Sequence, residues 1–155
     1  MCIRDRPYKV LGIWLIDQWK KLGVKVTHRV QASPAFYATL RKKKDFDVSI
    51  DFNCQSVINP IADITKFLGS AGNNYGQYND EVLEYLYDSI ARSPSPAEQR
   101  SLIRLYEKRA LSDMAHIAVT LWWYKINPHR SYVKGWKIAP SHYLNQQLDN
   151  VWLDK

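Results

Sequence analysis

The chain has 155 residues but only two cysteines, Cys2 and Cys54. Two cysteines cannot frame a disulfide-rich miniprotein, and these two lack the close pairing of a zinc site. Long hydrophobic runs are also missing, because no stretch approaches the roughly 18 uncharged apolar residues of a membrane-spanning helix. The opening of the chain has no charged start followed by an apolar core and a small-residue cleavage site, so we expect no secretory signal within these residues. The sequence therefore predicts no disulfide framework and no membrane span.

Catalytic and metal-binding motifs are equally absent. The four histidines show neither HxxxH nor HExxH spacing, and the chain has no nucleophile elbow, phosphate loop or dinucleotide fingerprint. Asp47 and Asp51 share one face of a predicted strand, but positions four residues apart on a strand are separated by roughly 13 Å. That separation is too large for the carboxylate pair of a glycosidase. We expect no catalytic residue, no metal and no cofactor, and an enzyme of unrecognised type that uses Asp47 or Asp51 stays an alternative.

What the sequence does have is the composition of a globular protein. Hydrophobic residues make up 46% and charged residues 24% of the chain, with six glycines and seven prolines. These values exclude disordered and collagen-like classes.

The net charge of +7 is distributed unevenly along the chain. Residues 1–44 carry 11 Lys and Arg against 2 Asp and Glu, whereas residues 45–155 carry 11 against 13. A basic nucleic-acid-binding module is therefore an alternative function. A nucleic-acid platform would need aromatic residues among these cations, and most Trp and Tyr residues lie in the other part. The cations at 41–44 also interact favourably with the dipole at the C-terminus of a helix, which accounts for this basic run without a nucleic acid. We therefore expect no nucleic-acid partner.

Apolar spacing and capping residues predict the helices. An apolar stripe predicts a helix over residues 10–22 that Gly23 ends. Ser33 as cap and Pro34 open a second helix, which ends in the basic run 41–44. Three further helices are predicted in the second half: one from Asn59-Pro60 to about Phe67, one opened by Asn79-Asp80-Glu81, and one opened by the capping box Ser95-Pro96-Ala97-Glu98.

Strict alternation of apolar and polar residues predicts strands over 24–29 and 46–52. Residues 117–124 form an apolar and aromatic run that predicts a buried strand. The order of strand, helix and strand over residues 24–52 is that of a βαβ unit. We therefore expect an α/β fold with a parallel pair of strands.

Aromatic residues with amide and hydroxyl neighbours form three clusters, after a strand, in a loop and at the end of a strand. Loops at the carboxyl ends of parallel strands are where α/β sheets place ligands. Aromatic walls with amide groups suit a small polar solute such as a sugar or a short peptide. The predicted ligand-binding residues are Asn53, Cys54, Ser56, Asn74, Tyr75, Trp122, Trp123 and Tyr124.

Several short motifs follow one another in a fixed order along the chain. They are Trp19-Lys20-Lys21-Leu22-Gly23-Val24-Lys25-Val26, Asp45-Phe46-Asp47-Val48, Asn59-Pro60, Asn74-Tyr75-Gly76-Gln77-Tyr78-Asn79, Pro96-Ala97-Glu98-Gln99-Arg100, Tyr106-Glu107, the run 117–124 and Val133-Lys134-Gly135-Trp136. In their order and spacing the chain resembles the C-terminal part of the family 5 extracytoplasmic solute-binding proteins, the dipeptide and oligopeptide-type receptors of ABC importers.

The resemblance implies an incomplete lobe of a type II-like periplasmic binding protein, with βαβ units and helices flanking a mixed sheet. Residues 7–124 would form most of the C-terminal lobe, and residues 125–155 would return to the other lobe. Residues 1–6 resemble a translated sequencing-adapter remnant, so we expect a non-native leader and a truncated gene that lacks the strand before Pro7.

The resemblance also implies a function that is not enzymatic. The intact receptor would be a periplasmic monomer that captures a small polar solute between two lobes and delivers it to the permease subunits. In peptide-binding members an aspartate pairs with the α-ammonium group of the ligand, and Ser56 stands at the matching position. Because serine cannot supply a charge-assisted bond, a neutral oligosaccharide is favoured and a peptide-like solute stays open.

Overall fold

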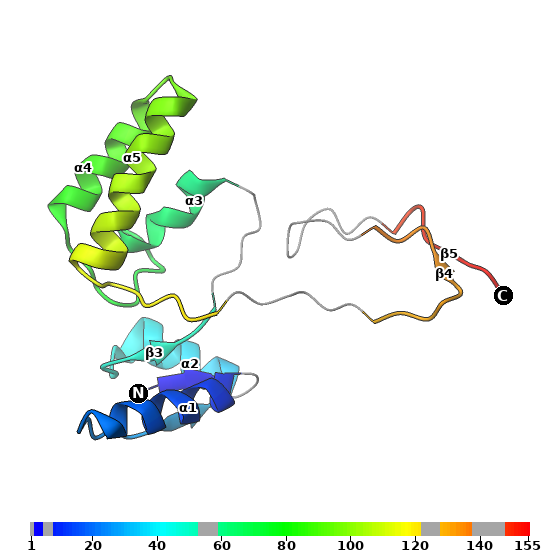
Figure 1. Cartoon of the computed structure of the whole chain (residues 1–155), viewed down its shortest axis with the longest axis horizontal. Helices are drawn as coiled ribbons and strands as arrows, with labels where there is room; N and C mark the ends of the chain where they lie inside the picture. The colour runs from blue at the N-terminus through cyan, green and yellow to red at the C-terminus, as the bar shows by residue number, and fades with distance from the viewer. Residues whose placement is uncertain (1, 5–7, 53–58, 122–127, 138–147) are drawn as a thin grey trace. The chain divides into compact units, whose positions relative to one another are not determined.

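A computed structural model of the chain contains helices and short strands (Figure 1). The chain forms two units, Met1–Asn53 and Cys54–Lys155. No helix among the described residues is long and apolar enough to cross a membrane. The residues that the structure describes are 2–4, 8–52, 59–121, 128–137 and 148–155.

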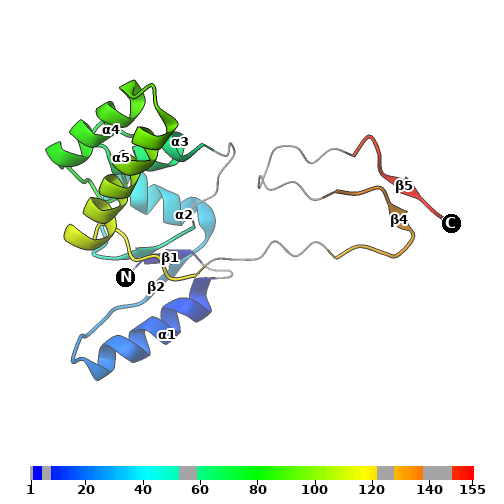
Figure 2. The same cartoon turned by 45° about the horizontal axis from the view of Figure 1, so that its top comes forward.

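The first unit is built on a three-stranded parallel sheet (Figure 2). Its elements are β1 (Cys2–Arg4), α1 (Tyr8–Lys21), β2 (Arg29–Gln31), α2 (Ser33–Ala38), a π-helical turn η1 (Thr39–Lys43) and β3 (Ser49–Ile50). The strand order is β2-β1-β3, and β1 pairs in parallel with both neighbours. In this register Ile3 lies opposite Val30 on one side and Ile50 on the other.

Helix α1 ends where the sequence predicts. Gly23 has a φ of +81°, a left-handed conformation that glycine adopts without steric cost. Its amide donates to the carbonyl of Lys20 at 3.0 Å, which closes the last turn. The inner side of α1 packs Tyr8 against Ile50 of β3, and both side chains are buried. One face of α1 therefore already lies in the core of this unit.

Helix α2 begins one residue earlier than predicted. Ala32, which has no side chain able to cap, occupies the cap position, and Ser33 is the first helical residue. The helix continues into η1 and stops at Lys44, whose φ is +53°. The basic run 41–44 thus lies at the end of a helix, where the helix dipole favours cations.

The strands of the first unit differ from the prediction in place and length. Of the strand predicted over 24–29, only Arg29 belongs to β2, and residues 24–28 form neither helix nor strand. Only two residues of the strand predicted over 46–52 form β3. Both strands run parallel, as predicted, but β1 lies between them. Cys2–Arg4 therefore supply a strand before Pro7, where the sequence led us to expect none. Since β1 has three residues, neither neighbour can form a longer ladder with it.

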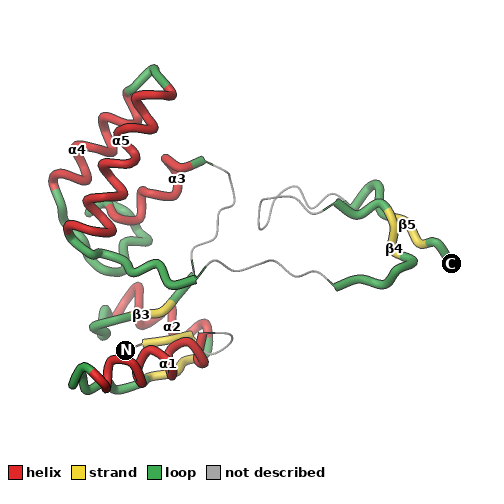
Figure 3. The backbone as a smooth tube through the Cα atoms, in the orientation of Figure 1, coloured by secondary structure: helices red, strands yellow, loops and turns green. Residues whose placement is uncertain are grey.

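The second unit is mainly helical over residues 60–113 (Figure 3). Its elements are α3 (Pro60–Ile64), a 3-10 turn η2 (Thr65–Phe67), α4 (Glu81–Arg92), α5 (Pro96–Lys108), a π-helical turn η3 (Arg109–Asp113), β4 (Val133–Lys134) and β5 (Trp152–Leu153). Helices α4 and α5 lie side by side in this unit. Strands β4 and β5 form an antiparallel pair in which Val133 lies opposite Leu153.

The predicted caps of α3 and α5 are confirmed. Asn59 Oδ1 accepts a hydrogen bond from the amide of Ile61 at 3.0 Å, and Ser95 Oγ accepts one from the amide of Glu98 at 3.4 Å. The predicted capping box is only half formed. Glu98 does not reach back to the amide of Ser95, because its Oε2 accepts from the hydroxyl of Ser93 at 2.5 Å.

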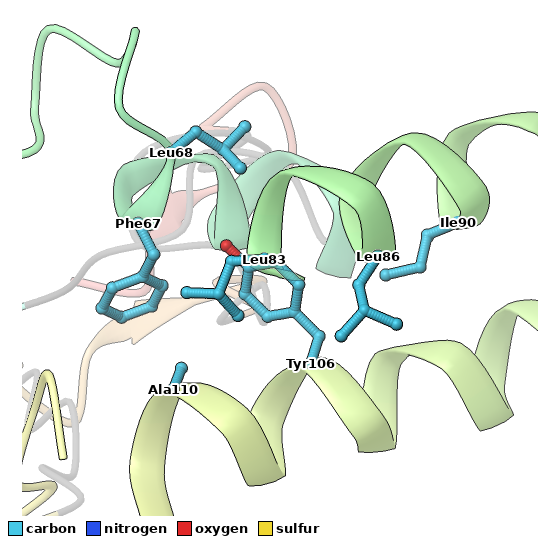
Figure 4. Packing of buried hydrophobic residues seen from close by; sticks show 7 residues of the cluster. All are labelled: Phe67, Leu68, Leu83, Leu86, Ile90, Tyr106 and Ala110. Atoms are coloured by element: carbon cyan, nitrogen blue, oxygen red, sulfur yellow. The ribbon is translucent and has the colours of Figure 1, made fainter. Parts of the chain in front are cut away.

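A buried apolar cluster joins α4 and α5 (Figure 4). Leu83 and Ile90 have no exposed surface, and Tyr106 is 1% exposed. The Tyr106 hydroxyl donates to the carbonyl of Ile64 at 2.9 Å, so this phenol satisfies its polar atom while the ring fills the core. The cluster consists of Phe67, Leu68, Leu83, Leu86, Ile90, Tyr106 and Ala110.

The buried strand predicted over 117–124 is wrong for its described part. Residues 117–121 form neither helix nor strand, and Val119 and Leu121 are 58% and 53% exposed. A strand needs a partner for its amides and carbonyls, and among the described residues none pairs with this segment. Residues 122–124 lie outside the described residues.

Candidate functional site

The structure describes one of the three predicted ligand-binding clusters. Asn74 and Tyr75 lie in the loop between η2 and α4, hereafter the 68–80 loop. The predicted roles of the other residues stay predictions. Those that lie outside the described residues are Asn53, Cys54, Ser56, Trp122, Trp123 and Tyr124.

Asn74 holds the 68–80 loop together. Its side chain is buried, and Nδ2 donates to the carbonyls of Leu68 at 3.0 Å and Tyr78 at 2.8 Å. Its Oδ1 accepts from the amide of Tyr78 at 3.0 Å. Both amide protons are therefore used inside the loop. Neighbouring Tyr75 is half-buried, and a ligand contact for either residue stays a prediction.

Gly76 allows Tyr78 to fold back over the loop. A Cβ at Gly76 would collide with the ring of Tyr78, whose Cζ is the nearest atom. The ring packs against His116 with centroids 4.0 Å apart and against Phe67 with centroids 5.9 Å apart. The Tyr78 hydroxyl donates to the backbone carbonyl of His116, and burial raises the pKa of this phenol. The loop thus contacts the segment that follows η3.

Asp80 ends the loop and is the centre of a buried polar cluster. Its side chain is 4% exposed, and it caps α4 by accepting from the amide of Val82 at 3.0 Å. Arg109 Nε donates to Asp80 Oδ2 at 2.9 Å, and Arg109 Nη2 lies 3.4 Å from Oδ1. His116 Nε2 is buried 3.8 Å from Oδ2 and has no hydrogen-bond partner. The carboxylate therefore joins the start of α4 to η3 and to the segment after it.

Opposing effects set the protonation of Asp80. Burial alone would raise the pKa of this carboxyl. Hydrogen bonds from Arg109 and from two backbone amides, together with the charge of Arg109, outweigh burial and lower the pKa below its usual value. The carboxylate is thus charged at neutral pH and forms an ion pair with Arg109, whose side chain is 30% exposed.

In the sequence Asp80 is recognisable only as part of a helix start, and Arg109 is not recognisable as its partner. Arg109 stands among the apolar positions of α5 and η3, beside Tyr106 and Ala110. A cation on the apolar stripe of a helix was the available signal, because buried charges are paired.

The two aspartates of the enzyme alternative do not share a site. Asp47 is exposed and lines an open hollow together with Arg29 and Asp45, which are ion-paired at 2.7 Å. Asp51 is not among the lining residues, and its Oδ1 accepts from the hydroxyl of Tyr37 at 3.3 Å. No group of three or more His, Cys, Asp or Glu residues in the described part of the chain could hold a metal ion.

Comparison with known proteins gives matches at the level of structure. No family model matches the chain, and no curated protein matches it. Among the solved structures, the periplasmic murein tripeptide binding protein MppA, in an unliganded open form, shares 16% sequence identity at a TM-score of 0.67 and covers 74% of this chain and 22% of its own.

Two further solved structures match the same share of the chain. The ABC transporter substrate-binding protein CtaP from Listeria monocytogenes shares 17% identity at a TM-score of 0.60 and is covered over 24% of its length. The pheromone receptor PrgZ, in a study of its mode of peptide binding, shares 21% identity at a TM-score of 0.57 and is covered over 22%. The chain thus has the α/β fold of part of a type II-like periplasmic binding protein, as the sequence predicts, and spans less than a quarter of the length of these three proteins.

The ion pair between Asp80 and Arg109 predicts how the free energy of unfolding changes with pH. Because the folded pKa of Asp80 lies below the unfolded value, its stabilisation is present above about pH 4 and is lost as the pH falls through the folded pKa. Asp80→Asn keeps a capping side chain but leaves Arg109 without its anion. We expect urea unfolding to give a loss of about 3 kcal/mol at neutral pH, and a smaller difference from the wild type in acid.

The matched control for this prediction is Asp88→Asn. Asp88 lies on the same helix and pairs with Arg92 at 2.8 Å, but its side chain is 61% exposed. An exposed pair contributes little, so we expect no marked change at either pH. Equal losses for the two variants would contradict a special role for Asp80.

Gly76 generates a second prediction. Gly76→Ala should displace Tyr78 and lower the free energy of unfolding by about 1–3 kcal/mol, because the new methyl group has no space. Gly72→Ala is the control, since a Cβ at Gly72 meets nothing within 4 Å. Thermal unfolding of both variants measures the difference, and a stable Gly76→Ala protein would contradict the close packing of this loop.

Proposed function

We propose that the chain is part of a family 5 solute-binding protein of an ABC importer. The observation that carries this proposal is the match of 74% of the chain to three binding proteins at TM-scores of 0.57 to 0.67. The order of sequence motifs supports the same family independently of the structure. The complete protein would act outside the cytoplasm and deliver its solute to permease subunits.

The proposed solute is a short peptide or a peptide-like molecule. Two of the three matching proteins bind peptides: MppA is a murein tripeptide binding protein, and PrgZ is described with its mode of peptide binding. Ser56 argues against recognition of a free α-ammonium group, because a neutral hydroxyl cannot replace the carboxylate that would bind it. A peptide whose amino end is blocked satisfies both observations. An oligosaccharide is the alternative that the same aromatic and amide residues would accept.

We propose that the ligand contacts come from the three clusters identified in the sequence. Asn53, Cys54 and Ser56 follow β3, and the carboxyl ends of parallel strands face a common edge. The 68–80 loop is held in one shape by Asn74, so Tyr75 is presented from a fixed backbone. Residues 122–124 follow the exposed segment 118–121 and would contact the solute where the chain crosses between lobes.

The mechanism that follows is closure of two lobes around the solute. One lobe alone makes only part of the contacts, so it binds weakly. Binding to both lobes stabilises the closed state by the difference in affinity between the closed and open forms. In this proposal residues 7–124 belong to one lobe and residues 125–155 return to the other. The chemistry is recognition and release, with no bond made or broken.

Ser56 generates the prediction that tests the proposed solute. The protein expressed from the complete gene should bind N-acetylated tripeptides in calorimetric titrations, and the same peptides with free amino ends at least about tenfold more weakly. Ser56→Asp should reverse this preference, because a carboxylate forms a charge-assisted bond with an ammonium group.

The control for this experiment is Ser101→Asp, which adds the same charge on an exposed position of α5. It should leave both affinities unchanged. Tight binding of free dipeptides that Ser56→Ala does not affect would contradict the role of Ser56. Binding of oligosaccharides without any binding of peptides would overturn the proposed solute class.

A further inference from the structure

The outer face of α1 and the turn that follows it form an exposed surface of apolar residues and lysines. We propose that this surface, hereafter the α1 face, binds the headgroup region of an anionic phospholipid membrane. The inference does not rest on the proposed transport function, because it uses only residues of the first unit. The residues of the α1 face are Lys9, Val10, Ile13, Trp14, Asp17, Lys20, Lys21, Leu22, Val24 and Lys25.

The apolar residues of the α1 face are unusually exposed. Val10 is 74%, Ile13 52% and Trp14 57% exposed, although the other side of the same helix buries Tyr8 and packs on β1. Leu22 and Val24 extend the surface past the end of the helix and are 78% and 50% exposed. Because α1 already contributes a face to the core of the unit, these residues form a second apolar surface.

Helical spacing places lysines along one edge of this surface and within it. At 100° per residue, Lys9 and Lys20 lie beside Ile13 on one edge, and Lys21 lies between Val10 and Trp14. All three lysines are exposed, as is Lys25 in the turn.

Asp17, the only acidic residue of the α1 face, is exposed between the lysines and forms an ion pair with Lys21 at 3.2 Å. The α1 face therefore carries four cations and one anion, a net charge of +3.

This combination fits a lipid headgroup region better than a neutral protein surface. An interfacial helix places aliphatic residues and Trp at the boundary of headgroups and acyl chains, while lysines reach outward to anionic phosphates. Tryptophan prefers this boundary because its ring is apolar and its N–H is polar. The positive charge of the α1 face is complementary to anionic lipids. Because of these lysines, we propose an anionic membrane as the partner of this face.

Co-sedimentation of the full chain with vesicles tests the proposal. We expect binding to vesicles of equal parts phosphatidylcholine and phosphatidylglycerol, weaker binding at high salt, and little binding to pure phosphatidylcholine. Replacing Lys20, Lys21 and Lys25 by Gln should weaken binding roughly a hundredfold, from about fivefold per charge. Trp14→Ser should weaken it about tenfold.

Matched variants elsewhere in the chain control for overall charge and for aromatic content. Replacing Arg100, Arg104 and Lys134 by Gln removes three exposed cations from the second unit, and Trp152→Ser removes a Trp that is 56% exposed on β5. Both control proteins should bind the mixed vesicles as the unaltered chain does.

Three results would overturn the proposal. They are equal losses for the α1 and control variants, equal binding to both kinds of vesicle, and no binding to either. Peptide titrations of the Trp14→Ser protein from the complete gene separate this inference from the proposed function, because solute affinity should be unchanged. A failure of solute binding in the unaltered protein would leave the vesicle result valid.

Discussion

The ion pair between the buried carboxylate of Asp80 and Arg109 is the constraint on which the second unit depends. A carboxylate that is 4% exposed loses most of its hydration, and only a paired cation and well-placed amides offset that loss. Asp80 has both, since it caps α4 and accepts from Arg109 at 2.9 Å. The position of the first turn of α4 is therefore tied to the end of α5, and the apolar cluster between these helices depends on that alignment.

The position of Asp80 also constrains the 68–80 loop, which carries two residues of the candidate site. The 68–80 loop must end at Asp80, so its length is fixed, and Asn74 closes it from inside. Tyr78 then folds over Gly76 and bonds to the carbonyl of His116, which lies beside Asp80. The exposed segment 118–121 thus begins two residues after His116, which this polar cluster holds. Residues 122–124, the aromatic part of the proposed site, follow that segment.

Local patterns predicted what local interactions determine. The end of α1 at Gly23 and the caps at Asn59 and Ser95 follow from the conformation and hydrogen bonding of neighbouring residues. A strand needs a distant segment to pair with. The alternation over 46–52 therefore could not show that only the two residues of β3 would pair. The three residues of β1 have no period to detect, although they form the centre of the sheet.

The site was harder to predict than the fold for the same physical reason. Asn74 looks like a ligand-binding amide in the sequence, and its use within the loop depends on carbonyls that only folding brings near.

The most direct test of the proposed solute-binding role is a crystal structure of the complete gene product with bound peptide. Residues 53–56 and 122–124 should contact the peptide between two lobes. A peptide bound away from both segments, or a chain without a second lobe, would contradict it.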